Sequence, residues 1–213
     1  MNSKIKNLIF LVFLISPYYG YTNKLKLGLN GGINFSTITA SNATKEFNMG
    51  KGFLPGMLLG ITSEYELDND LYLITEINYS SKGYSNNQLA IRVKSYSKYL
   101  TVPVKIKIYT QNMLGLEIGP YFSIAMKEYL KNNITKTKVY GSIGNNILSE
   151  PPDTLKPFDF GIQTGLSYSL NNINLAGMIS FGIFNIRPGG GLGSSIRNLS
   201  TQIRVSYNLF NLN

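Results

Sequence analysis

The sequence contains no cysteine, no histidine and no tryptophan. Without cysteine the chain can form no disulfide bond and cannot carry the amino-terminal lipid of a lipoprotein. Without cysteine or histidine it lacks the side chains that bind transition metals most often. Histidine is also the usual general base of a hydrolase. We therefore expect no transition-metal site, no cofactor and no Ser–His catalytic pair.

Long apolar segments are scarce as well. Mean hydropathy is −0.02, and beyond the amino-terminal segment no stretch approaches the about 18 apolar residues of a transmembrane helix. The one uniform apolar run covers residues 8–15, after two lysines and before Pro17. A basic segment followed by a short apolar core is typical of a secretory signal peptide. We predict that residues 1–22 are a signal peptide and that residues 23–213 form one exported domain.

What the chain has instead is a strict alternation of apolar and polar residues. Between residues 24 and 36 every second side chain is apolar, apart from Gly31, and lysine, glycine, asparagine or serine lies between them. Such alternation is typical of a β-strand with two different faces. The polar face is too small and hydrophilic for the core of a soluble lipocalin-like barrel, which would hold apolar side chains. The pattern instead predicts a strand with lipid on one face and the interior of a transmembrane barrel on the other.

The alternation recurs eight times, and the connections between its segments differ in length. Three connections, 67–69, 110–112 and 171–173, are tight and rich in turn-forming residues, and the other four are long. This combination is typical of outer-membrane barrels whose short turns and termini lie in the periplasm. We predict an all-β fold, an eight-stranded antiparallel up-and-down transmembrane β-barrel in the outer membrane. Its strands are expected at 24–36, 52–66, 70–82, 98–109, 113–126, 157–170, 174–185 and 198–212.

The residues expected to face lipid fit this prediction. No charged residue falls among them, as the cost of about 2–4 kcal/mol for Lys or Arg at the bilayer midplane requires. Aromatic residues gather at the strand ends, where they are expected to form two interfacial girdles. The predicted girdle residues are Phe35, Phe53, Tyr79 and Phe158 toward the long loops, and Tyr65, Tyr109, Tyr168 and Phe210 toward the turns.

The long-loop side is strongly basic, and the whole chain has a net charge of +9. One interpretation is a solvated loop surface; the sharper one places cations beside the phosphates of outer-leaflet glycolipid. The candidate contacts with lipid phosphate or a partner are Lys131, Lys136 and Lys138, in the longest connection, 127–156. The other cations assigned to this side are Lys45, Lys51, Lys82, Arg92, Lys94, Lys98, Lys127, Lys156, Arg187 and Arg197, against Glu46, Glu128, Glu150 and Asp153.

The inward-facing parity places the charged residues Glu76, Lys105, Glu117, Asp159 and Arg204 within the lumen. Counting from the tight turns puts Lys105 opposite Glu117 and Glu76 opposite Gly60. Opposite charges in so narrow a barrel would form a salt-bridge network that closes it. The alternative is a loose set of solvated polar residues.

Several strings resemble the PorT-type outer-membrane β-barrel family of Bacteroidetes. The clearest are GLNGGINFS at 28–36, YSSKG at 79–83 and YLTVPVKIK at 99–107, the last similar to the family's Tyr-Leu-x-x-Pro strand. The family often has an acidic residue where Thr101 stands. Further similar strings lie at 119–120, 159–165, 181–186 and 198–210. The resemblance implies an eight-stranded outer-membrane barrel, and the founding member is linked to type IX secretion and gliding.

Two classes of function follow from these observations. The first is a non-catalytic outer-membrane barrel, an accessory of a secretion, gliding or adhesion assembly that acts through its basic loops. The second is a small pore or transporter, which is disfavoured because the interior of eight strands is just wide enough for side chains. A lipid-modifying enzyme is disfavoured further by the absence of histidine. Expected partners are outer-membrane lipid and glycolipid and components of such an assembly; nucleic acid is not expected.

Overall fold

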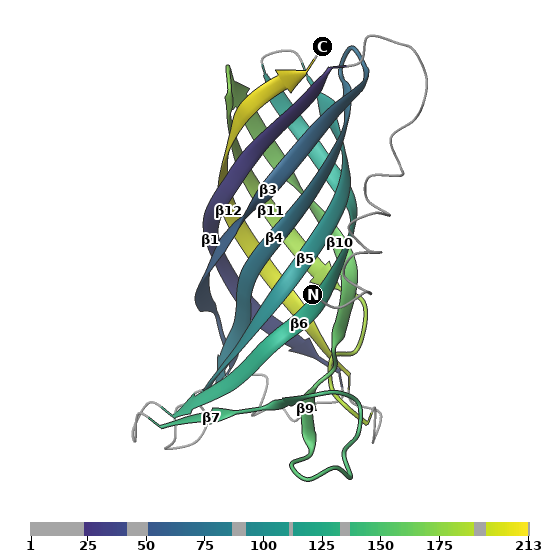
Figure 1. The fold of residues 1–213 in the computed structure, drawn as a ribbon. Coiled ribbons are helices and arrows are strands. Elements are labelled where there is room, and N and C mark those ends of the chain that lie inside the picture. Colours follow the sequence, from purple (N-terminus) through teal and green to yellow (C-terminus); the bar gives the residue numbers. More distant parts are fainter. Residues whose placement is uncertain are drawn as a thin grey trace.

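The computed structural model describes residues 24–41, 51–86, 93–110, 113–132, 137–189 and 195–212. Eight long strands form a closed ring in which each strand pairs antiparallel with its neighbours, as predicted (Figure 1). The predicted signal peptide, residues 1–22, and four residues assigned to the loop side, Lys45, Glu46, Arg92 and Lys136, lie outside the described residues. In ring order the strands are β1 (Leu25–Ala40), β3 (Leu54–Asp68), β4 (Leu71–Asn86), β5 (Val93–Tyr109), β6 (Leu114–Asn132), β10 (Phe158–Leu170), β11 (Ile173–Gly182) and β12 (Ile196–Leu212).

The two faces of the ring differ as the alternation predicts. Apolar side chains of the outer face are exposed: Met57 is 71% and Ile203 62% accessible. The inner face buries amides, hydroxyls and charges, among them Asn34, Ser123 and Asp159. In the part of the chain that the structure describes, no helix is long and apolar enough to cross a membrane.

The ring has a turn end and a loop end. At the turn end lie the start of β1, the end of β12 and the tight connections β3–β4, β5–β6 and β10–β11 (Figure 1). At the loop end several strands run farther than the sequence pattern predicted, and β2 (Lys51–Gly52) pairs with β4 there. The backbone hydrogen bonds between these strands continue beyond the last residues of the apolar alternation. The alternation ends earlier because it reflects contact with lipid, and strand pairing does not require that contact. In contrast, β11 ends at Gly182 instead of 185, because the amides of Ile183 and Phe184 both donate to the carbonyl of Phe160.

The longest connection is folded where it is described. It contributes β7 (Lys138–Tyr140), which pairs with the end of β6, and β8 (Ser142–Ile143), which pairs in parallel with β9 (Asp153–Leu155). These strands lie at and beyond the loop end of the ring (Figure 1). Leu155 and Ile186 pack against Tyr99 and Ala125 in a small buried apolar cluster. The loop end of the barrel is therefore capped by its own loops.

A β-bulge in β6 changes which side chains face outward. Tyr99 pairs with Ala125, but the next residue of β5, Lys98, pairs with Lys127, so Met126 is an extra residue in β6. Successive side chains of a strand point to opposite faces, and an extra residue reverses that order beyond it. Beyond the bulge Lys127 is therefore exposed and Glu128 is buried.

Candidate functional site: the charged lumen and the loop-end sheet

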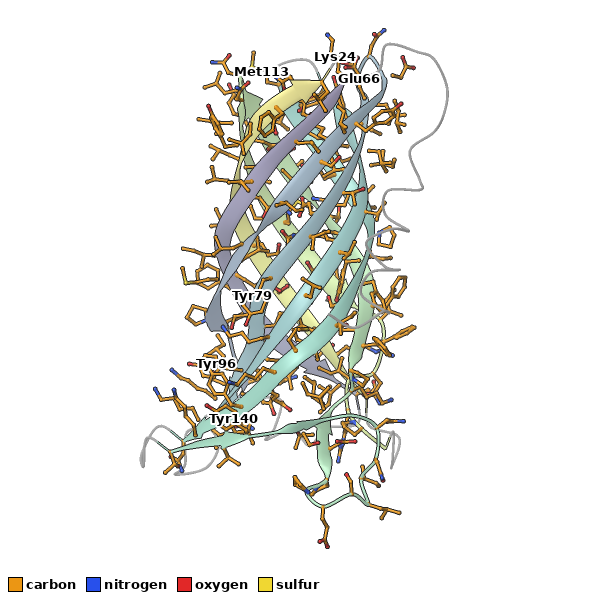
Figure 2. All side chains as sticks on the ribbon, viewed as in Figure 1. Lys24, Glu66, Tyr79, Tyr96, Met113 and Tyr140 are labelled. Atoms are coloured by element: carbon orange, nitrogen blue, oxygen red, sulfur yellow. The ribbon has the colours of Figure 1, made fainter. Side chains whose placement is uncertain are left out.

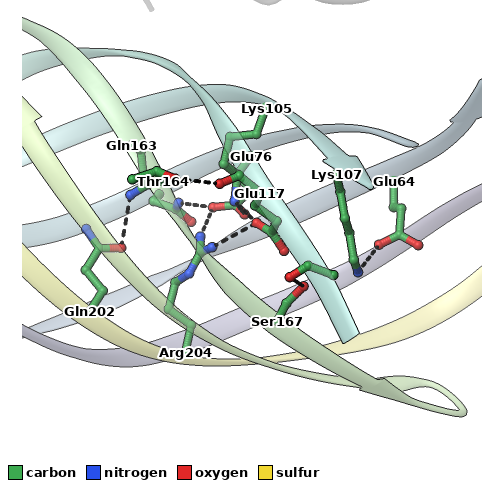
Figure 3. Close-up of polar contacts among 12 residues, drawn as sticks. Glu64, Glu76, Lys105, Lys107, Glu117, Gln163, Thr164, Ser167, Gln202 and Arg204 are labelled. Atoms are coloured by element: carbon green, nitrogen blue, oxygen red, sulfur yellow. Dashed lines mark hydrogen bonds and ion pairs between the residues drawn. The ribbon is translucent and has the colours of Figure 1, made fainter. Parts of the chain in front are cut away.

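The middle of the lumen holds a four-residue ion network from β4, β5, β6 and β12 (Figure 3). The Nζ of Lys105 lies 2.7 Å from Oε1 of Glu76 and 2.7 Å from Oε2 of Glu117. Across the ring, Arg204 pairs with Glu76 and places its Nη2 3.5 Å from Oε2 of Glu117. Each acid therefore meets both cations, and none of the four side chains is more than 3% exposed. Two positive and two negative charges balance within this network.

The registers that were predicted for these residues are wrong by two positions. Lys107, not Lys105, is the cross-strand partner of Glu117, and Thr62, not Gly60, is the partner of Glu76. At the β5–β6 turn Tyr109 pairs with Gly115 and the amide of Thr110 donates to the carbonyl of Leu114, so the turn is centred one residue later than the predicted 110–112. At the β3–β4 turn Asp68 pairs with Leu71, so the turn lies at 69–70 instead of 67–69, and a bulge between Glu66 and Asp68 then shifts the pairing by one residue. Lys105 reaches Glu117 diagonally, which its long side chain allows.

Asp159 was predicted in the same network, but the structure places it in a separate cluster nearer the loop end. Its backbone pairs with Ser123, which pairs with Thr101. Thr101 lies four residues before Lys105 in β5, about 13 Å along the strand. At that level Asp159 pairs with Lys82 at 3.1 Å and accepts a hydrogen bond of 2.9 Å from the Asn198 amide.

Lys82 was assigned to the solvated loop side, and this prediction is wrong as well. Its side chain is 2% exposed and lies in the lumen. The Nζ is 4.6 Å from the ring centroid of Tyr121 and 4.9 Å from that of Tyr99. Two aromatic faces and one carboxylate therefore surround this buried ammonium group.

A third charged cluster closes the turn end. Glu64 lies 3.2 Å from the Nζ of Lys107 and 3.4 Å from that of Lys26. Lys107 also lies 4.2 Å from the ring centroid of Tyr109, whose hydroxyl is 2.7 Å from that of Ser169. Tyr109 was predicted in the turn-side girdle; its odd position in β5, like that of Lys107, directs it into the lumen instead.

These three clusters leave little free space beside the central network. The cavity lined by Glu76, Glu117 and Arg204 has a volume of about 10 Å³, which is room for about one water molecule. Removing one member of a buried ion pair typically costs about 3–5 kcal/mol, because the other charge remains buried. The arrangement can therefore hold the strands together and close the lumen.

Two of the three predicted contact lysines, Lys131 and Lys138, lie in a small three-stranded sheet outside the lumen. We call it the loop-end sheet: residues 93–98 of β5, 127–132 of β6, and β7. Lys131 lies in its middle strand, between Lys94 and Lys138, its partners on the two neighbouring strands. Two of the three predicted contacts, Lys131 and Lys138, are thus direct neighbours. Figure 2 labels Tyr96 and Tyr140 of this sheet, near the end opposite to Lys24 and Met113.

The inner side of the loop-end sheet holds the folded long loop. Glu128 is buried and accepts hydrogen bonds from Ser95 at 3.3 Å and from Thr154 of β9 at 2.5 Å. Next to it, Asp153 accepts hydrogen bonds from the Ser142 hydroxyl and the Asn146 amide, at 2.7 and 2.8 Å. These bonds lower the pKa of the Asp153 carboxyl below its usual value. They stabilise the ionised form and join β8 to β9.

Several of these residues were not predicted from the sequence to lie where the structure places them. Glu64, Lys82 and Lys107 lie on inward-facing parities, and strand alternation could have identified them as lumen residues. The tyrosines of the loop-end sheet gave no such signal, since only the pairing of β5, β6 and β7 aligns them. Within the described ranges, no group of three or more acidic side chains lies close enough to hold a metal ion.

Comparisons with known proteins agree with the fold. Neisserial surface protein A is similar in structure, with a TM-score of 0.51 and 14% identity over 86% of this chain and 97% of its own. Ail, the attachment invasion locus protein of Yersinia pestis, gives 0.47 and 11% identity over 88% of this chain and 99% of its own. No curated protein sequence matches the chain. The model of the outer membrane protein beta-barrel domain matches residues 16–187, and the chain therefore belongs to that family of outer-membrane barrels.

Proposed function

We propose that this protein is a closed, non-catalytic outer-membrane barrel that serves a secretion, gliding or adhesion assembly through its loop end. In this proposal the loop end faces the outside of the cell and the tight turns face the periplasm. The difference between the two ends of the barrel supports this orientation. The turn end has very short connections, whereas the loop end carries a folded sheet and a cap made by its own loops. The absence of histidine and cysteine supports a non-catalytic role.

The observation that carries the proposal is that ion pairs fill the lumen at three levels. The pairs Lys107–Glu64, Arg204–Glu117 and Lys82–Asp159 join strands that are not neighbours in the ring. A permeating solute would have to separate several of these buried pairs, each of which is costly to break. The folded sheet at the loop end can instead contact a partner while the lumen stays closed.

Orientation can be tested with epitope insertions in the full-length protein. An epitope after Leu148, which is 88% exposed in the long loop, should be labelled on intact cells. The matched insertion between Asp68 and Leu71, at the turn end, should be labelled only after the outer membrane is opened. Labelling of both, or of the turn insertion alone, would contradict the orientation.

The second candidate, a small pore, is tested by single-channel recording. The wild-type barrel in a planar bilayer should give no steady conductance, since the central cavity holds only about 10 Å³. A stable open conductance would favour the pore. The double variant Lys105→Ala with Glu117→Ala serves as the positive control for conductance, because it removes the middle of the ion network.

The assembly role is tested with a photo-crosslinking residue at Val139, which is 62% exposed in β7. In native outer membranes it should form a discrete adduct with a second protein that co-purifies with the tagged barrel. The same residue at Leu67, 41% exposed at the turn end, is the control. Recovery of the barrel without any adduct at Val139 would contradict the assembly role.

A further inference from the structure

The outward face of the loop-end sheet carries three parallel rows of side chains. Direct cross-strand pairing aligns each row, and side chains two residues apart in a strand share a face. We call the eight residues together the Lys/Tyr face. The first row is Lys98 and Lys127, the second is Tyr96, Tyr129 and Tyr140, and the third is Lys94, Lys131 and Lys138.

Contacts between the side chains agree with this alignment. The rings of Tyr96 and Tyr129 stack, with centroids 5.0 Å apart and planes at 12°, and the Tyr140 ring is 6.2 Å from that of Tyr129. The Nζ of Lys127 lies 4.6 Å from the Tyr140 centroid, and that of Lys138 lies 5.8 Å from the Tyr129 centroid. The tyrosines thus form a continuous aromatic strip with ammonium groups on both sides.

The charge of this face is not balanced within the sheet. Its strands contain one acidic residue, Glu128, and the bulge at Met126 turns that carboxylate inward, toward Thr154. Lys131 meanwhile lies directly between Lys94 and Lys138. Like charges opposite one another destabilise a sheet. An anionic ligand would relieve this repulsion, and five lysines together offer it a strong site.

The position of the face indicates which anion lies beside it. In β5 the face continues directly from the lipid-facing surface: Leu100 pairs with Tyr79 on one side and with Ile124 on the other. The three rows lie two, four and six residues beyond Leu100, or about 7, 13 and 20 Å along the strand. With a strand tilt of about 40°, they rise about 5 to 15 Å above the apolar band. This is the depth of lipid headgroups and of the sugars attached to them.

We propose that the Lys/Tyr face binds the phosphorylated sugar headgroup of a glycolipid in the outer leaflet around the barrel. The lysines of the first and third rows contact phosphate groups, and the tyrosine strip packs against the faces of sugar rings. The proposal rests on the orientation given under Proposed function, with the loop end outside. It does not require a protein partner at β7.

The test measures glycolipid retention by native mass spectrometry and its dependence on salt. The probe is purified rough-type lipopolysaccharide, phosphorylated on its lipid and inner-core sugars, added to the full-length mature barrel in neutral detergent. Each lysine near an anionic surface contributes about a fivefold gain in affinity. Lys131→Gln with Lys138→Gln should therefore weaken binding about 25-fold and make its salt dependence shallower. Tyr129→Leu should weaken binding and leave the salt dependence unchanged.

The matched control replaces Lys156 and Arg197, two cations at the same end but outside the face. Lys156→Gln with Arg197→Gln should leave binding unchanged, and dephosphorylated probe should bind the wild type as weakly as the face variant does. Equal losses in the two double variants, or none in either, would overturn the proposal. Equal affinity for a soluble phosphorylated oligosaccharide without acyl chains would overturn the glycolipid assignment. None of these results depends on the crosslink at Val139. The assembly role and the glycolipid site can therefore be refuted independently of each other.

Discussion

The ammonium group of Lys105 lies 2.7 Å from the carboxylate of Glu117, although the two residues are not cross-strand partners. The backbone partner of Glu117 is Lys107, whose side chain pairs with Glu64 at the turn end instead. The lumen thus divides two neighbouring lysines of β5 between two different clusters. Side-chain reach, more than backbone register, decides which charges meet.

The first prediction concerns the value of this pair to stability. Glu117→Ala or Lys105→Ala alone should lower the free energy of unfolding by about 3–5 kcal/mol, because the remaining charge stays buried with too few partners. The double variant should recover part of that loss, since both unpaired charges are then gone. Urea unfolding midpoints in detergent or lipid measure the effect. Strictly additive losses would contradict a coupled pair.

The second prediction is that the central and loop-end clusters act independently. Lys82 and Asp159 share no hydrogen-bonding or ion-pair partner with Lys105 or Glu117 among the described residues. Combining Lys82→Met with Glu117→Gln should therefore give the sum of the two single losses within about 0.5 kcal/mol. The measurement is again urea unfolding of the single and double variants. A combined loss far from this sum would indicate that Asp159 belongs to one network with Glu117 after all.

The third prediction concerns the bulge at Met126. Deleting this residue should place Lys127 directly after Ala125, remove the bulge and keep the existing cross-strand partners, so that the side chain at 129 still points outward and that at 128 inward. Cysteine is absent from the chain, so Tyr129→Cys and Glu128→Cys each give a single reactive thiol. A membrane-impermeant reagent should modify position 129 and leave position 128 unmodified, both in the parent protein and after the deletion.

The folded state of each deletion variant is checked by its altered gel mobility without boiling. Labelling of position 128 in a folded deletion variant would show that the register of β6 shifts instead, and would contradict the assignment of Met126 as the extra residue.

The fourth prediction concerns the long loop and pH. Hydrogen bonds from Ser142 and Asn146 lower the pKa of Asp153, so the folded loop favours the ionised form. This stabilisation is present above the usual carboxyl pKa, about 3.9, and is lost as pH falls through the lower pKa of the folded loop. Carboxyl chemical shifts in lipid nanodiscs should give Asp153 a pKa below that of a peptide spanning the same residues. Ser142→Ala should raise it; an equal pKa in both variants would exclude the Ser142 bond as a cause.

The eight-stranded architecture follows from the residue pattern alone. Alternating polarity, three tight turns and the absence of charge from the apolar parity sufficed for an eight-stranded outer-membrane barrel, because lipid imposes the same two-residue period on every strand. The inward position of Glu76, Lys105, Glu117, Asp159 and Arg204 follows from the same parity. Such local rules need no knowledge of which residues lie side by side.

Which charges pair, and which side chains share a face, depends on how the strands come together in three dimensions. The β5–β6 and β3–β4 turns lie later in the chain than predicted, and together with the bulge beside Glu66 this moved the registers by two residues. The level of β10 separated Asp159 from Glu117 and joined it to Lys82. One extra residue, Met126, placed Glu128 inside and the lysines and tyrosines of β6 outside. Register and bulges depend on turn geometry and on the partner strand, and a pattern read along one strand contains neither.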